Sequence, residues 1–268
     1  HVIRTKPFAW VINDNLDRSA KEFENRYTRS FEKNKKKGIT KLDNGPKWAL
    51  WPGHGTLCFG YSIKEAQIVY DINRHTIRAM QTSFNLHKWQ PISFRNLFDV
   101  EYWSLEQAKI KKQKKLLEGN IAVVTGSTGT IGFETYKMFK SYGAEVVLLD
   151  NNLDRLKAVQ SKIIDLCIHC DVTNKKSVKS AFKQICEKFG GIDILISNAG
   201  TAPSGAIGEV SDAVLRKSFE INFFSHQNCA SEAIKIMKKQ NINGCLLFNI
   251  SKQSVNPGKN FGPYGLPK

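Results

Sequence analysis

Short apolar runs alternate with longer amphipathic stretches through the second half of the chain. The runs are rich in Ile, Val and Leu and predict strands at residues 121–125, 146–150, 166–172, 194–197 and 245–250. The stretches between them predict helices at residues 133–142, 153–162, 175–189 and 212–239. Near-continuous apolar strands that alternate with helices are typical of a parallel sheet covered on both faces. We therefore predict a doubly wound α/β domain of the Rossmann type, with its ligand site at the carboxyl ends of the strands.

The first half of the chain has a weaker pattern. A turn at Pro52-Gly53 precedes a predicted strand at residues 56–59, and apolar positions at helical spacing predict a helix at 63–81. Residues 104–117 predict an amphipathic, strongly basic helix, followed by a Gly-Asn stop signal at 119–120. The predicted organisation is a first domain at 1–103, a basic helical linker at 104–120 and the α/β domain at 121–268.

The 268-residue chain carries a formal net charge of +16, which raises the question of a nucleic-acid or anionic-membrane partner. Its lysine clusters, at residues 33–37 and 109–115, are not interleaved with the aromatic residues that stack on bases. We interpret them as solvated surface and expect no nucleic-acid partner. The longest apolar runs are far shorter than the roughly 18–20 residues that cross a bilayer, so we expect no membrane association.

The six cysteines bear on metal binding and on the cellular compartment. Cys167 and Cys170 have the spacing of a metal or redox pair, but no second such pair completes a four-ligand site, so we expect no structural metal there. Unpaired cysteines in a domain of this type indicate a reducing, cytoplasmic location. The chain begins with His1 rather than Met, and we expect it to be a fragment of a longer protein.

A glycine-rich turn follows the first predicted strand of the α/β domain and opens a helix. In that context glycines permit a tight turn, a close approach of the backbone to a pyrophosphate, and close packing of the helix on the strand. The free N–H groups of the helix N-terminus would then bind the phosphates. The candidate residues are Gly126, Ser127, Thr128, Gly129, Thr130, Ile131 and Gly132.

Asp150 ends the second predicted strand, at the place where an acidic side chain binds the adenosine ribose of a dinucleotide. Its carboxylate would accept hydrogen bonds from both ribose hydroxyls and repel a 2′-phosphate. No arginine stands beside it, although Arg155 is near. We therefore predict NAD rather than NADP as the cofactor.

The ordered motifs of residues 121–268 resemble the short-chain dehydrogenase/reductase family. The resemblance places Asp171 and Val172 beside the adenine ring and matches the family's turn after the fourth strand, with Ser197 in place of its first asparagine. A Tyr-x-x-x-Lys motif closes the chain, thirteen residues after a serine. Besides the glycine turn and Asp150, the cofactor and catalytic residues that the resemblance implies are Asp171, Val172, Asn198, Ala199, Gly200, Asn222, Ser251, Tyr264 and Lys268.

The catalytic residue types suit hydride transfer to or from an alcohol carbon. The hydroxyl proton needs a base, and an unassisted phenol with a pKa of about 10 is a poor one at neutral pH. A lysine four residues after Tyr264 would share its helix face and stabilise the phenolate. The resemblance implies that Ser251 holds the substrate oxygen, that Lys268 also reaches the nicotinamide ribose, and that Asn222 is the family's structural and proton-relay asparagine.

Three features depart from the family's usual pattern. Glycine at 129 and threonine at 130 give the spacing of sugar-nucleotide-modifying members, so such a relative stays an alternative, as does a non-catalytic dinucleotide-binding module. Pro267 removes a backbone N–H directly before Lys268. The family's fold continues beyond the Tyr-x-x-x-Lys helix, so we expect the sheet to be incomplete at its C-terminal end and this chain by itself to be inactive.

Residues 51–66 and 71–76 resemble the end of an α/β class II aldolase/adducin-type domain. Residues 98–109 resemble the junction of fused class II aldolase/short-chain dehydrogenases, the rhamnulose-1-phosphate aldolase/alcohol dehydrogenase group. This resemblance implies a bifunctional parent acting on a small hydroxy or aldehyde compound of sugar catabolism, homo-oligomeric in its full-length form. Class II aldolases use a divalent metal, and His54 lies where the family places its last metal histidine, a role that would require the complete protein.

Overall fold

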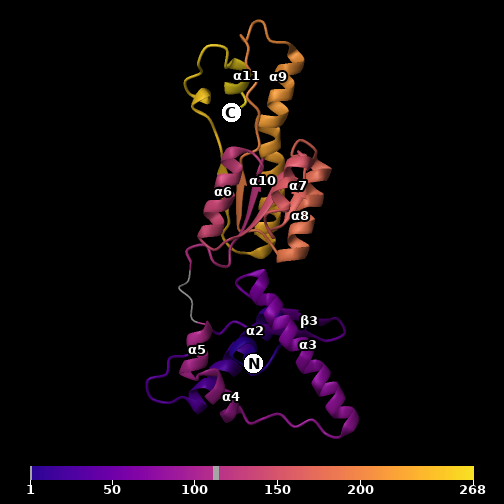
Figure 1. The fold of residues 1–268 in the computed structure, drawn as a ribbon, viewed down its shortest axis with the longest axis vertical. Helices are drawn as coiled ribbons and strands as arrows, with labels where there is room; N and C mark the ends of the chain where they lie inside the picture. Colours follow the sequence, from indigo (N-terminus) through magenta and orange to yellow (C-terminus); the bar gives the residue numbers. More distant parts are fainter. Residues whose placement is uncertain (1, 111–114) are drawn as a thin grey trace. The chain divides into compact units, whose positions relative to one another are not determined.

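The computed structural model describes residues 2–110 and 115–268. These residues form two compact units, which we name unit 1 (His1–Lys114) and unit 2 (Lys115–Lys268). Figure 1 shows unit 1 in indigo to magenta and unit 2 in magenta to yellow. Among the residues described, no helix combines the length and apolarity required to cross a membrane.

Unit 1 packs helices around a small mixed sheet of order β1-β2-β3. Strand β1 runs parallel to β2, and β2 runs antiparallel to β3. Helix α2 buries Phe23, Tyr27 and Phe31, which share one face because they are four residues apart. The elements are α1 (Val2–Thr5), β1 (Trp10–Val11), α2 (Leu16–Asn34), β2 (Trp48–Trp51), β3 (Gly55–Cys58), α3 (Ile63–Leu86), α4 (Phe94–Glu101) and α5 (Ser104–Ile110).

A buried polar cluster joins α2 to α4 inside unit 1. The Tyr27 hydroxyl donates to Glu101 Oε1 at 2.8 Å and lies 2.8 Å from the Tyr102 hydroxyl. The Lys6 ammonium lies 3.7 Å from the centroid of the Tyr27 ring and donates to the Asp43 carbonyl oxygen. Burial lowers the pKa of Lys6 to about 8 and raises that of Glu101.

Unit 2 is built on a parallel sheet of order β6-β5-β4-β7-β8. Its elements are β4 (Ile121–Thr125), α6 (Thr130–Ser141), β5 (Glu145–Asp150), α7 (Leu153–Gln160), β6 (Cys167–His169), α8 (Lys175–Phe189), β7 (Ile194–Ser197), α9 (Asp212–Phe219), η1 (Glu220–Phe224), α10 (Ser225–Gln240), β8 (Cys245–Phe248), η2 (Lys252–Ser254) and α11 (Gly262–Gly265). The predicted doubly wound Rossmann-type fold is confirmed.

Alternate residues of each strand bury on opposite faces of this sheet. Val123 and Val147 pack with α8 and α10, whereas Ala122 and Val124 pack with α6 and α7. Both faces are therefore covered, which explains why the strands have almost no polar positions. Figure 1 shows these helices around the sheet.

Two strand predictions were too long. The strand expected at 166–172 is paired only over Cys167–His169, and the strand expected at 245–250 ends at Phe248. Cys170 and Val172 are nevertheless buried, at 1% and 8% exposure. Their side chains enter the core without joining the ladder, because apolar burial does not require strand pairing.

Two helix predictions also need correction. The helix expected at 212–239 is interrupted by one π-helical stretch, η1, between α9 and α10. Of the basic helix expected at 104–117, α5 accounts for Ser104–Ile110, residues 111–114 lie outside the described residues, and residues 116–119 form a turn. The Leu117 N–H bonds the Tyr142 carbonyl oxygen, so this end of the expected linker packs as part of unit 2.

Candidate functional site

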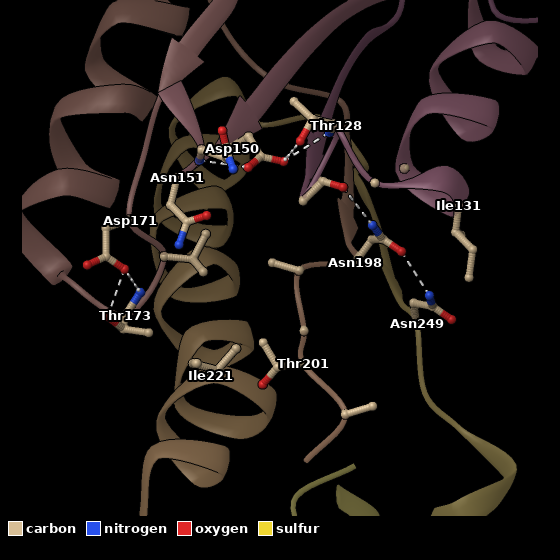
Figure 2. Close-up of a pocket in the computed structure, with 18 of the residues that line it drawn as sticks. Thr128, Ile131, Asp150, Asn151, Asp171, Thr173, Asn198, Thr201, Ile221 and Asn249 are labelled. Atoms are coloured by element: carbon tan, nitrogen blue, oxygen red, sulfur yellow. Dashed lines mark hydrogen bonds between the residues drawn. The ribbon is translucent and has the colours of Figure 1, made fainter. Parts of the chain in front are cut away.

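A cavity of about 870 Å³ lies at the carboxyl ends of the unit 2 strands. Figure 2 shows residues from successive strand ends facing into it. The predicted site residues that line it are Gly126, Thr128, Gly129, Thr130, Ile131, Gly132, Asp150, Asp171, Val172, Asn198, Ala199, Gly200, Tyr264 and Lys268. Ser127, Asn222 and Ser251 are not part of its lining, and His54 belongs to unit 1.

The turn between β4 and α6 forms a cradle that only glycine permits. Gly126 has φ +60°, in the left-handed region that favours glycine. A Cβ on Gly132 would collide with the Gly126 carbonyl oxygen and with the backbone of Ser127. Gly129 caps α6 without a side chain, which leaves the first N–H groups of the helix open toward the cavity. Such a helix N-terminus fits a pyrophosphate.

Asp150 is held in a fixed orientation at the end of β5. Thr128 donates to its Oδ2 from both the backbone N–H, at 2.9 Å, and the hydroxyl, at 2.8 Å. The Asn152 N–H donates to Oδ1 at 2.9 Å. Figure 2 shows the Thr128 bonds beside the glycine turn. A carboxylate accepts about four hydrogen bonds, so capacity for ribose hydroxyls remains.

Residues 171–173 follow β6 and line the cavity at that end of the sheet; we name them the β6 wall. The Asp171 carboxylate accepts from the N–H and the hydroxyl of Thr173, at 3.0 and 2.7 Å (Figure 2). The Asp171 N–H in turn donates to the Ser177 hydroxyl of α8 at 3.1 Å. The wall is therefore an ordered turn that presents Val172 and the Asp171 carboxylate to the cavity.

Hydrogen bonds of Asn198 and Asn249 connect the glycine turn to the residues that follow β8. The Asn198 amide donates to the carbonyl oxygens of Thr125 and Gly126, at 3.0 and 3.3 Å. Its oxygen accepts from the Asn249 amide at 2.8 Å, as Figure 2 shows. Asn198 thus stabilises the turn and also lines the cavity. Nothing in the sequence pattern singled out Asn249.

Asn222 lies in the π-helical stretch and is 1% exposed. Its amide oxygen accepts from the Thr201 N–H at 3.0 Å, and its nitrogen donates to the Thr201 carbonyl and the Ser218 hydroxyl, at 2.9 and 3.0 Å. The side chain therefore anchors the chain that follows β7. A Cβ on Gly200 would lie 2.8 Å from this amide oxygen and 3.1 Å from Lys268 Nζ, so glycine is required for the close approach.

Tyr264 and Lys268 both reach the cavity, although not from one helix as expected. Helix α11 spans Gly262–Gly265, so it includes Tyr264 but not Lys268. The Lys268 ammonium still lies 5.9 Å from the centroid of the Tyr264 ring and donates to the Asn249 carbonyl oxygen at 3.0 Å. Burial lowers the pKa of Lys268.

Ser251 caps the short 3-10 turn η2. Its hydroxyl oxygen accepts from the Gln253 N–H at 3.2 Å, and the Ser254 hydroxyl donates to its carbonyl oxygen. Ser251 is not among the residues that line the cavity.

His226 is a neighbour of this site that the sequence did not reveal. Its Nδ1 lies 2.6 Å from the hydroxyl of Ser197, the residue that differs from the family's asparagine. Burial, and then the Lys268 ammonium, lower the pKa of His226 to about 4. The imidazole is therefore neutral at pH 7.

No cluster of three or more His, Cys, Asp or Glu side chains in the described ranges is arranged to hold a metal. The His54 ring packs against Trp51, with centroids 4.4 Å apart. Cys167 and Cys170 are free thiols whose pKa values burial raises, the former to about 11. The histidine and the cysteine pair thus have no metal-site geometry within the described part of the chain.

Comparison with known proteins divides the chain at the same region. Residues 120–268 match the family described as short chain dehydrogenase, and residues 1–110 match the one described as aldolase class II, second domain. The uncharacterized oxidoreductase YuxG of Bacillus subtilis is 29% identical over 266 residues, covering 96% of this chain and 39% of its own length.

Other relatives match about half of the chain. Short chain aldehyde dehydrogenase 1 of Euphorbia lathyris is 34% identical over 150 residues, which are 53% of this chain and 51% of that protein. A short-chain type dehydrogenase/reductase structure from Mycobacterium marinum has a TM-score of 0.54 at 25% identity, over 56% of this chain and 64% of that one. The chain thus spans about two fifths to one half of the length of these two curated relatives.

Proposed function

This chain belongs to the short-chain dehydrogenase family, and we propose that it is part of an NAD-dependent oxidoreductase that interconverts a small hydroxy compound and its carbonyl form. The observation that carries the proposal is the Asp150 carboxylate, fixed beside the glycine turn at the cavity edge. A dinucleotide fits the donors present: open helix N–H groups for the pyrophosphate, and carboxylate oxygens for the ribose.

Asp150 favours NAD through both charge and geometry. With Thr128 and Asn152 fixing its two oxygens, the carboxylate cannot swing away from an incoming 2′-phosphate without losing those hydrogen bonds. Two unit charges about 4 Å apart near a protein surface repel by about 4 kcal/mol. Arg155 also lines the cavity and offsets part of this repulsion. We therefore expect a preference for NAD rather than a complete exclusion of NADP.

The nicotinamide ring of the bound dinucleotide supplies the hydride exchange. The chain's own residues handle the proton: Tyr264 as the phenolate would take it from the substrate hydroxyl, and Tyr264 as the phenol would return it to the substrate oxygen. The Lys268 ammonium stabilises the phenolate form electrostatically, and its bond to the Asn249 carbonyl oxygen fixes its direction. Ser251 would hold the substrate oxygen by donating its hydroxyl hydrogen, which the bond accepted from the Gln253 N–H leaves available.

The aldolase-like half supports a bifunctional parent of sugar catabolism. YuxG, an oxidoreductase by its name, aligns with 96% of this chain and therefore with both units. A dehydrogenase fused to an aldolase-type domain would act on a small hydroxy or aldehyde compound that the cleavage reaction produces or consumes. In that parent, His54 would be one histidine of a divalent-metal site.

Titration with NADH and NADPH, followed by nucleotide fluorescence, tests the cofactor assignment. NADH should bind at least about tenfold more tightly than NADPH, a difference of about 1.4 kcal/mol. Asp150→Asn should reduce that ratio, because it removes the negative charge and one acceptor of the Thr128 bonds. Asp154→Asn is the matched control, since Asp154 is exposed at the start of α7 and does not line the cavity.

Binding of neither nucleotide by the wild-type chain would contradict the proposed function. Tighter binding of NADPH, or an equal change of the ratio in both variants, would contradict the role of Asp150 while leaving the dinucleotide site intact.

A further inference from the structure

Asn228 lies on α10, behind the β6 wall. Its amide nitrogen donates to the Val172 carbonyl oxygen at 3.1 Å and to the Thr173 carbonyl oxygen at 3.4 Å. The side chain is 6% exposed, and it is not among the residues that line the main cavity. It therefore contacts the wall from the side opposite to the ligand space.

The β6 wall has no strand partner: the Asn174 N–H donates to the Asp171 carbonyl oxygen and closes the turn, and side chains supply its other hydrogen bonds. Strand β6 ends at His169, so the ladder with β5 does not extend through residues 171–173. The wall's N-terminal end is held by Ser177 of α8, and its internal turn by the Asp171 carboxylate. The carbonyl oxygens of Val172 and Thr173 point toward α10, where Asn228 meets both.

Asn228 uses the two ends of its amide unequally. The nitrogen makes both wall contacts, whereas the oxygen, Oδ1, has no hydrogen-bond partner among the described protein atoms. A buried amide generally has both ends satisfied. What this asparagine provides to its surroundings is thus a pair of donated hydrogen bonds directed at the wall.

The strand order indicates that the β6 wall lies near the adenosine half of a bound dinucleotide. Strand β6 is at one edge of the sheet, whereas the Lys268 ammonium bonds the Asn249 carbonyl oxygen, just after β8 at the other edge. A dinucleotide with its pyrophosphate at the N-terminus of α6 then has its adenosine toward the β6 wall. This placement rests on the proposed function.

We propose that Asn228 is a positioning residue for adenine: its amide holds the Val172 and Thr173 carbonyl groups so that the β6 wall contacts the base. Without the amide, the β6 wall loses its two hydrogen bonds to α10 and is less well positioned. Binding of the adenosine half of the dinucleotide is then weaker. The nicotinamide half, at the opposite end of the cavity, keeps its contacts.

Half-ligands separate this role from a general effect on folding. The Asn228→Leu variant is titrated with ADP-ribose, by calorimetry, and with reduced nicotinamide mononucleotide, by its fluorescence. Affinity for ADP-ribose should fall about tenfold, as expected when one or two hydrogen bonds that order the site are lost, while affinity for the mononucleotide should change by less than about twofold. Gln227→Leu, at the exposed neighbouring position on α10, is the matched control and should leave both affinities unchanged.

A second variant covers the case in which Asn228→Leu fails to fold. In Asn228→Asp the ionised carboxylate faces two carbonyl oxygens and repels them, whereas the protonated carboxyl group donates one hydrogen bond. Affinity for ADP-ribose should therefore recover as the pH falls from 9 to 5, relative to the wild type over the same range.

Three results would overturn the inference. Equal losses for both half-ligands in Asn228→Leu would show a structural role only, and unchanged affinity for ADP-ribose would show that the wall does not need the amide. In Asn228→Asp, a ratio of the variant's ADP-ribose affinity to that of the wild type that does not change with pH would also show that the wall does not need the amide. If the wild-type chain binds neither half-ligand, the proposed function itself fails, and the inference fails with it.

Discussion

Acidification from pH 7 to pH 5 should destabilise unit 2 through one imidazole, that of His226. Burial and the nearby Lys268 ammonium lower the pKa of His226 to about 4. Since the folded pKa lies below the unfolded value of 6.5, the unfolded chain binds more protons throughout this window. The contribution of His226 is therefore fully present above pH 6.5 and is lost as the pH falls toward 4.

The size of the effect follows from the pKa difference. Each pKa unit corresponds to about 1.36 kcal/mol, so the full displacement would give about 3 kcal/mol. The imidazole is only partly buried, and solvent screening reduces the contribution of such a group. We therefore expect about 1–2 kcal/mol in total, of which about 1 kcal/mol is lost by pH 5.

Urea unfolding followed by far-UV circular dichroism at pH 7.5, 6 and 5 measures this loss. His226→Gln is the comparison, because glutamine keeps a hydrogen-bonding group near Ser197 but does not titrate. The wild type should lose about 1 kcal/mol more than the variant between pH 7.5 and pH 5. All five tryptophans lie before residue 115, so tryptophan fluorescence reports unit 1 and should show the same pH dependence in both proteins. If circular dichroism gives the wild type and His226→Gln the same loss of unfolding free energy between pH 7.5 and pH 5, the reasoning is refuted.

Two further substitutions test close contacts. Gly200→Ala places a methyl group between the Asn222 amide and the Lys268 ammonium, so we expect a loss of about 1–3 kcal/mol in stability and weaker NADH binding. Thermal unfolding and NADH titration check this, and an unchanged melting temperature would contradict it. Tyr27→Phe leaves the buried Glu101 carboxyl group without its 2.8 Å donor, which should cost about 1–3 kcal/mol. Urea unfolding followed by tryptophan fluorescence measures it in unit 1, and a variant as stable as the wild type would show that the hydroxyl is dispensable.

The strands and helices with clear boundary signals were predicted to the residue. Strands β4 and β7 and helix α8 have the predicted bounds, because each is an apolar or amphipathic run that polar or glycine residues delimit. For α8, the Asn174 side chain caps the start and Gly190, with φ +87°, ends the helix. Such local chemistry is visible in sequence because it involves neighbours along the chain.

The elements that were missed or altered depend on contacts that the sequence does not display. Helix α2 carries Phe23, Tyr27 and Phe31 at helical spacing, a usable signal that the surrounding charged residues obscured. The π-helical stretch at Glu220–Phe224 has no comparable signal. It arises where Asn222 turns inward to bind Thr201, twenty-one residues away.

The residues of the candidate site likewise fall into those that sequence motifs predicted and those that depend on long-range contacts. Sequence motifs identified most of the lining, because glycine turns and strand-end acids recur at fixed spacing. They did not identify Asn249, His226 or Asn228, whose hydrogen bonds join residues far apart in the chain. They also did not predict that the Ser251 hydroxyl oxygen accepts a hydrogen bond from the Gln253 N–H. Such partners are defined by the packed structure and by no local pattern.

These long-range amides explain how the two ends of the site keep their spacing. The Asn198 amide binds the carbonyl oxygens of the glycine turn, and its oxygen binds the Asn249 side chain. The carbonyl oxygen of the same Asn249 receives the Lys268 ammonium. Hydrogen bonds made by Asn198 and Asn249 therefore link the glycine turn to the Lys268 ammonium. Because protein groups alone make these bonds, they fix the spacing of the glycine turn and the ammonium, and the proposed dinucleotide would bind at a lower ordering cost.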